Sequence, residues 1–181
     1  QLILMRPFYG SLIVRLQLIE WNQPTFGTDG EFIYCPKKHN FSPEEIRAIL
    51  AHETLHCALQ HVFRACNRDK IKWNVAADYA VNLILTKDNF ILPKYSLLDN
   101  QFQGMHAERI YTKLPDPIKI KIPLDLIQPG NKKDKGAGNN LEISVQSTSP
   151  KQLSEKEKKS IEDRAKELSQ EWKEHLAYAI E

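Results

Sequence analysis

Three side chains in the stretch "LAHETLHCALQH", residues 50–61, have the types and spacing needed for hydrolytic chemistry. His52 and His56 bracket Glu53 in the pattern His-Glu-x-x-His. In an α-helix, successive residues are rotated by about 100°, so the two histidines share one face and can bind one ion. This arrangement is typical of zinc sites in which the intervening glutamate acts as general base toward a water. The pattern predicts a zinc-dependent hydrolytic site with His52 and His56 as ligands and Glu53 as the catalytic residue.

A catalytic zinc site usually has three protein ligands, so one more is needed. His61 is close in sequence, but on a continuous helix it would be rotated by about 140° from His56. Zincins with three histidines have a glycine that breaks the helix after the motif, and Leu59 stands at that position here. We therefore expect His61 to support a ligand or to cap the helix end rather than to bind zinc.

The acid in "WNVAADYAVN", Asp78, is the better candidate for the third ligand. It lies among alanines and valines, where an unpaired carboxylate would be costly to bury. Asn82 follows one helical turn later and could orient Asp78 or a histidine. The alternative is that Asp78 forms a structural ion pair with Arg64 or Arg68.

Other polar residues are weaker candidates. His106 and Tyr111 could stabilise a developing negative charge near zinc, although a surface histidine and a core tyrosine are the ordinary expectation. Cys57 lies on the same helix as the motif but points away from both histidines, which favours a packed thiol.

The helix that carries the motif has a clear start. Ser42 can cap it, Pro43 suits its first position, and Glu45 completes a capping box with Ser42. The apolar pattern continues beyond the motif, so we expect one helix from about Pro43 to near Arg64.

Two strands are expected before this helix. Residues 12–20 alternate between apolar and polar side chains, which favours a half-buried strand, although a helix is a competing interpretation. Residues 31–35 follow the Asp-Gly turn signal of "FGTDG" and predict a second strand. If that strand lies at the edge of a sheet, it could bind an extended substrate by strand addition. A short helical turn is expected within residues 2–9, limited by Pro7.

Helices are also expected over 73–85, 104–114 and 154–181. The last begins with a capping box of Ser154 and Glu157 and has one apolar stripe. We expect a core domain over residues 1–128, a Gly/Lys/Asn-rich flexible linker over 129–153, and this amphipathic helix docked on the core or on a partner. The chain begins with Gln1 and ends inside a predicted helix, which suggests a piece of a longer protein.

Composition excludes several classes of protein. The chain has 181 residues and a net charge of +2, so charge gives no reason to expect nucleic acid or a membrane as partner. The apolar run near the start is interrupted by charged residues and proline and cannot span a bilayer. Three scattered cysteines do not form a disulfide framework, and reduced thiols suggest a cytoplasmic protein.

The motifs "PFYG", "TDG", "AHETLHCALQHVFR", "WNVAADYAVN" and "GMHAERIY" occur in this order. Together they resemble the VWA-like putative metallopeptidase domain family of bacteria and phages, over about residues 5–115. The resemblance implies a zincin-like peptidase domain with His52, His56 and Asp78 on zinc and Glu53 catalytic. It implies that His61 belongs to the family pattern without necessarily touching the metal. Members commonly carry a von Willebrand A-like domain, whose Asp-x-Ser-x-Ser motif this chain lacks.

We therefore expect an α+β, zincin-like fold with a small sheet or hairpin before the motif helix and a mostly helical remainder. The expected function is zinc-dependent hydrolysis of peptide bonds in a peptide or protein substrate. The first alternative is a metal-binding interaction module with a structural or vestigial zinc site, acting through the helix of 154–181 and a partner such as a missing VWA-like domain. The second alternative is a metal-free helical adaptor.

Overall fold

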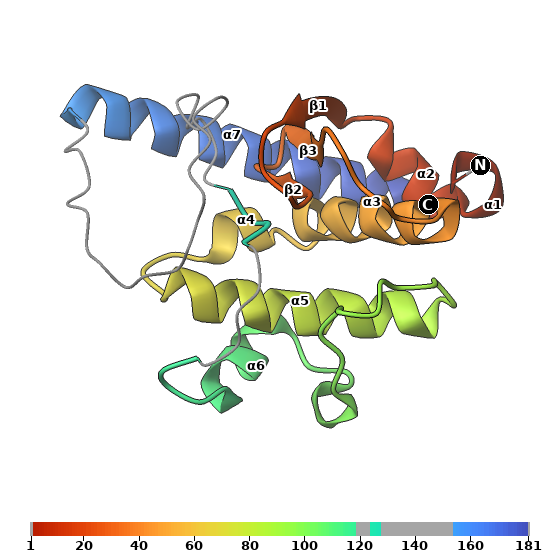
Figure 1. The fold of residues 1–181 in the computed structure, drawn as a ribbon. Helices are drawn as coiled ribbons and strands as arrows, with labels where there is room; N and C mark the ends of the chain where they lie inside the picture. The colour runs from red at the N-terminus through yellow and green to blue at the C-terminus, as the bar shows by residue number, and fades with distance from the viewer. Residues whose placement is uncertain (1, 119–123, 128–153, 181) are drawn as a thin grey trace.

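The computed structural model describes residues 2–118, 124–127 and 154–180, and it shows an α+β fold with one small sheet (Figure 1). In chain order the elements are α1 (Leu2–Met5), α2 (Pro7–Ile13), β1 (Gln17–Trp21), β2 (Gly27–Thr28), β3 (Phe32–Pro36), α3 (Pro43–Ala58), α4 (His61–Arg64), α5 (Lys70–Lys87), the 3-10 helix η1 (Asn100–Phe102), α6 (Ala107–Lys113) and α7 (Glu155–Ile180).

The prediction of a strand over residues 12–20 is wrong in its first half. Helix α2 continues to Ile13, and β1 begins only at Gln17. Leu12 and Leu16 lie four residues apart and both enter the main core, whereas Val14 is 63% exposed. The spacing of the buried leucines is therefore that of a helical turn, and the apparent alternation around Val14 was misleading.

The Asp-Gly signal does form a hairpin, which joins β2 to β3 in antiparallel pairing. The Asp29 carboxylate accepts hydrogen bonds from the main-chain N–H groups of Glu31 and Phe32, at 3.0 and 2.9 Å. Gly30 has a φ of 89°, a conformation that favours glycine. The turn thus rests on local side-chain chemistry that the sequence displays.

Strand β3 lies in the middle of the sheet, between β1, to which it is parallel, and β2. The expectation that residues 31–35 form an edge strand for substrate is therefore wrong, because main-chain groups of β3 pair on both sides. Strands β1 and β2 form the edges of the sheet, and β2 contacts α3.

Helix α3 begins as predicted, with both hydrogen bonds of the capping box between Ser42 and Glu45. It ends at Ala58, not near Arg64. Gln60 has a φ of 63°, a left-handed conformation that stops the helix, and α4 begins after it. The side chain of Gln60 exchanges two 2.7 Å hydrogen bonds with Ser169 of α7, and Arg64 donates to the main-chain oxygen of Leu59. These contacts satisfy polar groups at the break.

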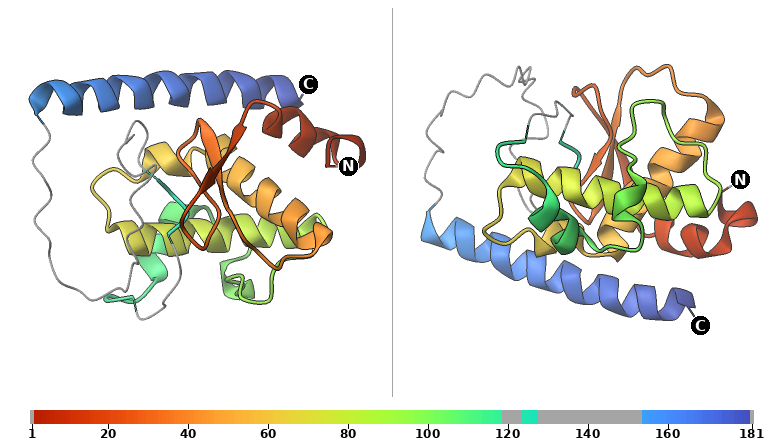
Figure 2. Two further views of the ribbon diagram at one scale, coloured as in Figure 1. Left: turned by 45° about the horizontal axis from the view of Figure 1, so that its top comes forward. Right: turned by 90° about the horizontal axis from the view of Figure 1, so that it is seen from below.

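Helices α3 and α5 lie side by side, and Figure 2 shows the same arrangement from two further directions. The helix expected over 73–85 is confirmed and extends over all of α5. Small Ala51 of α3 packs with Val81 and Leu85 of α5 in a shared cluster. The helix expected over 104–114 is confirmed as the shorter α6, which packs on the opposite side of α5.

Helix α7 packs along α2 and α3, so the predicted amphipathic helix is docked on the core (Figure 2). Leu168 and Trp172 are its buried residues, and Trp172 Nε1 donates to the main-chain oxygen of Gly30 at 2.7 Å. The predicted linker of 129–153 lies outside the described residues. Across the ranges that the structure describes, no helix combines the length and the apolar character required to cross a membrane.

Candidate metal centre

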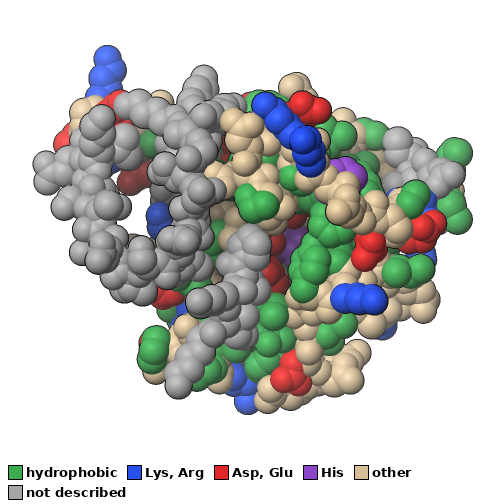
Figure 3. Space-filling view, viewed as in Figure 1, with side chains coloured by type: hydrophobic (Ala, Val, Ile, Leu, Met, Phe, Trp, Pro, Cys, Tyr) green, Lys and Arg blue, Asp and Glu red, His purple; other side chains and the backbone are tan. Residues whose placement is uncertain are grey.

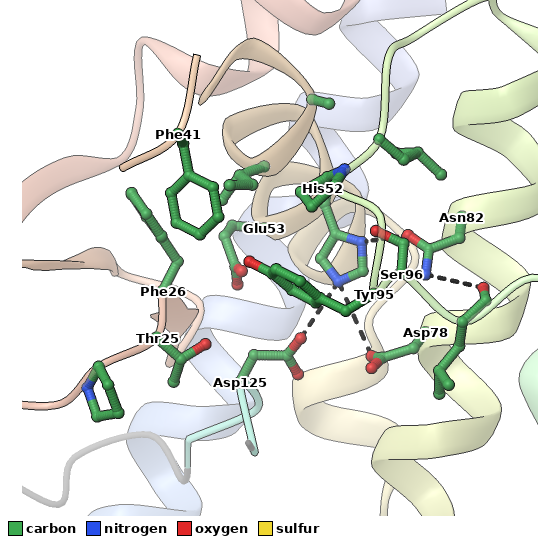
Figure 4. A pocket seen from close by; sticks show the side chains of 16 residues that line it. Thr25, Phe26, Phe41, His52, Glu53, Asp78, Asn82, Tyr95, Ser96 and Asp125 are labelled. Atoms are coloured by element: carbon green, nitrogen blue, oxygen red, sulfur yellow. Dashed lines mark hydrogen bonds and ion pairs between the residues drawn. The ribbon is translucent and has the colours of Figure 1, made fainter. Parts of the chain in front are cut away.

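His52 and Glu53 of α3 lie close to Asp78 of α5 (Figure 4). The Nε2 atoms of His52 and His56 are 2.8 Å apart, and the two rings lie edge to face. His56 is fully buried, and His52 is partly buried at the edge of a cavity. The helical spacing therefore produces the convergence that the pattern predicts.

Asp78 is carried to the same point by α5. Its Oδ1 atom lies 3.5 Å from His56 Nε2 and 3.8 Å from His52 Nε2. The alternative, an ion pair with an arginine, is not observed among the described residues. Arg64 instead pairs with Glu108, and the Arg68 guanidinium lies over the ring of Trp73 at 4.9 Å.

A fourth candidate, Asp125, is one that sequence reasoning missed. Its Oδ2 atom lies 3.2 Å from His52 Nε2 and 4.0 Å from His56 Nε2. One ligand atom from each of His52, His56, Asp78 and Asp125 lies within 4.8 Å of the others. An acid inside the apolar stretch "IPLDLI" was the available signal, of the same kind that singled out Asp78.

Asp125 is held by main-chain contacts on both sides. The main-chain oxygen of Asp125 accepts from the Thr28 N–H of β2 at 2.8 Å, and the Ile127 N–H donates to the main-chain oxygen of Thr28 at 2.8 Å. The Asn74 Oδ1 atom accepts from the N–H groups of Asp125 and Leu126, at 3.2 and 3.1 Å. The Asn74 Nδ2 group also lies 3.4 Å from both carboxylate oxygens of Asp78. One amide therefore positions both acids.

Asn82 orients the ring of His52. Its Nδ2 group donates to the main-chain oxygen of Leu97 at 3.0 Å, so its Oδ1 atom faces His52 Nδ1 at 2.9 Å. A carbonyl oxygen can only accept, which places a proton on Nδ1 of His52 and leaves the Nε2 lone pair directed into the site. The role expected for Asn82 as a support of a histidine agrees with this geometry.

His61 contacts His56 from behind the site. The Nδ1 atoms of the two rings are 3.1 Å apart, whereas His56 Nε2 faces the acids. The argument from rotation on one continuous helix was wrong, because the break at Gln60 turns His61 back toward His56. Burial lowers the pKa of both His56 and His61, so neutral rings are favoured and one can donate to the other.

Glu53 lies beside the cluster and faces the cavity (Figure 4). It is 2% exposed, and its Oε2 atom has no hydrogen-bond partner among the described residues. Burial, with the negative charge of Asp125 nearby, raises the pKa of Glu53 well above its usual range. A carboxyl with a raised pKa accepts a proton more readily than an ordinary glutamate does.

The cavity has a volume of about 470 Å³, within the range of roughly 300–1,000 Å³ that is common for ligand sites. Figure 3 shows this hollow, with histidine and acidic side chains deep inside and hydrophobic side chains around them. Its apolar lining consists of Pro24, Phe26, Phe41, Ala48, Ile49, Leu92, Pro93, Tyr95 and Leu97.

The two weaker candidates do not line this cavity. His106 is bonded to Glu108 and its side chain is 67% exposed. Tyr111 packs near Trp73 and its hydroxyl accepts from the Asp69 N–H. Cys57 is buried with its Sγ atom 3.2 Å from the Thr28 hydroxyl, as expected for a packed thiol.

The donor set suits a divalent cation. Two imidazole nitrogens and two carboxylates are the ligand types that zinc binds. Burial alone lowers the pKa of His52, but the carboxylates of Asp125 and Asp78 outweigh burial and raise it, so the site favours positive charge. Burial and Asp125 also raise the pKa of Asp78 well above its usual range. A buried Asp125 oxygen, Oδ1, has no partner within the described ranges, and a cation could satisfy it.

Comparison with known proteins supports this chemistry at the level of the family. Searches among curated proteins and among solved structures found no match. A family model matches residues 1–179, which is nearly the whole chain. The chain therefore belongs to the family described as "Putative metallopeptidase domain".

Proposed function

We propose that this protein is a zinc-dependent peptidase with a zincin-like active site. The observation that carries the proposal is the convergence of His52, His56 and Asp78 beside a buried Glu53 whose Oε2 atom has no partner in the described structure. The family assignment to a metallopeptidase domain supports the same reaction class. The substrate would be a peptide or a protein.

The three side chains His52, His56 and Asp78 would hold the ion. When bound, zinc supplies a Lewis acid that polarises the scissile carbonyl and lowers the pKa of a water. Glu53 takes the proton from the attacking water and then delivers it to the leaving amine. The raised pKa of Glu53 makes it a stronger base toward that water.

The surroundings of Glu53 allow a peptide to reach it. Glu53 and His52 line the cavity together with apolar side chains. Apolar lining with a few converging polar groups is typical of sites that bind a substrate side chain.

The three cysteines are free, which agrees with our proposal that the protein works in the cytoplasm.

One observation favours a second function. With Asp125 counted, the site has four protein side chains, and a site closed by four protein ligands is typical of structural zinc. In that case the domain would be a metal-binding interaction module, and the exposed face of α7 would contact its partner.

Substitution of Glu53 by Gln separates the two functions. Glu53→Gln keeps the size of the side chain but removes the base, so zinc content should be unchanged. Hydrolysis should fall by about a hundredfold to ten-thousandfold, which is the usual contribution of a positioned general base. The measurement is cleavage of a quenched fluorescent peptide library by zinc-loaded protein, with elemental analysis of zinc in each sample.

Glu162→Gln is the matched control, because Glu162 is exposed on α7. It should cleave as wild type does. If wild type and Glu53→Gln bind zinc but cleave equally, or if neither cleaves any member of the library, the peptidase proposal is wrong and the structural module is favoured.

A further inference from the structure

The segment 124–127, which we call the strap, lies against the edge of β2. Its Leu126 forms a parallel bridge with Thr28. The strap uses both main-chain groups of Thr28, since Asp125 accepts from the Thr28 N–H and Ile127 donates to the Thr28 oxygen. Thr28 is consequently fully buried.

These Thr28 groups are what an extended peptide would need. Strand addition binds a peptide through the main-chain groups of an exposed sheet edge. Strand β2 lies at an edge of the three-stranded sheet and packs against α3. Thr25 and Phe26, which directly precede β2, line the same cavity as Glu53, so a peptide that lies along β2 would reach this cavity. The strap occupies the same hydrogen-bonding groups.

The strap also fills the ion site. The Asp125 carboxylate lies 3.2 Å from His52 Nε2, so it stands with Asp78 among the potential ligands. A catalytic zinc site keeps one position open for water or substrate. With Asp125 in place, all four positions of a tetrahedral site would come from the protein.

We propose that the strap is an internal occupant of the active site, which competes with an extended peptide for Thr28 and for the open position on zinc. This inference rests on the proposed peptidase function. Two further features hold the strap in place. The Asn74 side chain accepts hydrogen bonds from two main-chain N–H groups of the strap. Gly27 has no side chain, which leaves room for the strap beside β2.

Gly27→Ala tests the proposal without changing any candidate ligand. A Cβ atom on residue 27 would stand 2.8 Å from the main-chain oxygen of Asp125 and 3.4 Å from its Cα, so the strap must shift. The probe is a short peptide hydroxamate with an apolar side chain, and its Kd for zinc-loaded protein is measured by calorimetry. If the strap fills the site in about nine-tenths of the molecules, its displacement should tighten hydroxamate binding about tenfold. The reason is that apparent affinity is proportional to the fraction of protein whose site is open.

Asp125→Ala is the second variant and needs no backbone shift. It should retain zinc on His52, His56 and Asp78 and should also bind the hydroxamate about tenfold more tightly, for the same reason. Asp163→Ala is the matched control, since Asp163 is exposed on α7 far along the chain, and it should bind as wild type does.

The outcomes are distinct. Tighter hydroxamate binding by both variants, with zinc retained, supports the strap as an occupant. Equal or weaker binding by both variants overturns it, and so does loss of zinc from Asp125→Ala, which would make Asp125 an obligate ligand. If the variants bind the hydroxamate more tightly but no form of the protein cleaves peptides, the peptidase function fails, and the strap is then an occupant of a metal site without catalytic activity. Failure of wild type to bind zinc overturns both.

Discussion

The two candidate histidine ligands, His52 and His56, are each oriented by a neighbour that contacts the ring nitrogen facing away from the site. Asn82 accepts from His52 Nδ1, and His61 faces His56 Nδ1 at 3.1 Å. Because burial favours neutral His61, its Nδ1 can accept the proton of His56 Nδ1, which leaves the His56 Nε2 lone pair free. Such contacts orient the ring and increase its basicity as a ligand.

We expect His61→Ala to bind zinc about tenfold to a hundredfold more weakly than wild type, the usual effect of removing such a support. His56→Ala should lose more affinity, because it removes a ligand. His61→Asn should restore part of the affinity, since an amide oxygen can accept the same proton. Zinc affinity is measured by competition with a chromophoric chelator.

His106→Ala is the control, because the His106 side chain is 67% exposed and lies outside the cavity. It should leave zinc affinity unchanged. Equal affinities for His61→Ala and wild type would show that His61 has no supporting role. Loss as complete as that of His56→Ala would make His61 a ligand.

The part of the site carried by one helix could be predicted from sequence. The spacing of His52, Glu53 and His56 places them together once α3 forms, and the apolar surroundings of Asp78 single it out. Asp125 shows a similar signal in "IPLDLI", but nothing in the sequence places it beside the histidines. It comes 47 residues after Asp78 in the sequence and is held by bonds to Thr28 and Asn74 that no local pattern reveals.

Among the elements, helix starts were easier to predict than helix ends. The capping box of α3 is local, so Ser42 and Glu45 display it in sequence. The end at Ala58 has neither glycine nor proline, and the left-handed Gln60 is bonded to Ser169, which lies 109 residues away. A break supported by a distant helix has no signal in the neighbouring residues.

A pair of charges ties α4 to α6 and gives a pH-dependent prediction. The Arg64 guanidinium donates two hydrogen bonds to Glu108 Oε1, at 2.9 and 2.5 Å, and also contacts Oε2. Burial raises the pKa of Glu108, but hydrogen bonds from Arg64, from a main-chain N–H and from His106, together with the Arg64 charge, lower it from 4.5 to about 2. A carboxyl with a lowered folded-state pKa stabilises the fold above its unfolded pKa, and the stabilisation is lost as pH falls through the folded value.

Glu108→Gln should therefore unfold at a lower urea concentration than wild type at pH 6. The difference in midpoint should shrink as pH falls from about 4.5 to about 2, where Glu108 becomes neutral in wild type too. Urea titrations at a series of pH values provide the measurement, and Glu162→Gln should show no difference at any pH. A difference that persists unchanged to pH 2 would contradict the role assigned to this ion pair.

At the scale of the whole molecule, the metal centre joins parts that are distant in sequence. Helix α3 contributes two candidate ligands, helix α5 and the strap contribute one each, and the strap is hydrogen-bonded to β2. Helix α7 covers the other side, where Trp172 bonds to the hairpin glycine Gly30 and lies in the same core cluster as Cys57 of the motif helix. Loss of the ion should therefore lower the stability of the whole fold and not only of the site.

Without an ion, three acids, Glu53, Asp78 and Asp125, are buried close together, which is unfavourable unless protons or a cation neutralise them. Under the proposed function, zinc would bind the folded centre and not the unfolded chain, so it should stabilise the fold by about 4 kcal/mol at a thousandfold excess over its Kd. We expect removal of zinc with a chelator to lower the thermal unfolding midpoint, and added zinc to restore it. Differential scanning calorimetry measures both.

Glu53→Gln should respond to zinc as wild type does, because its ligands remain, whereas His52→Ala and His56→Ala should respond little. A midpoint that is the same with chelator and with zinc would show that these residues do not form a metal centre coupled to folding.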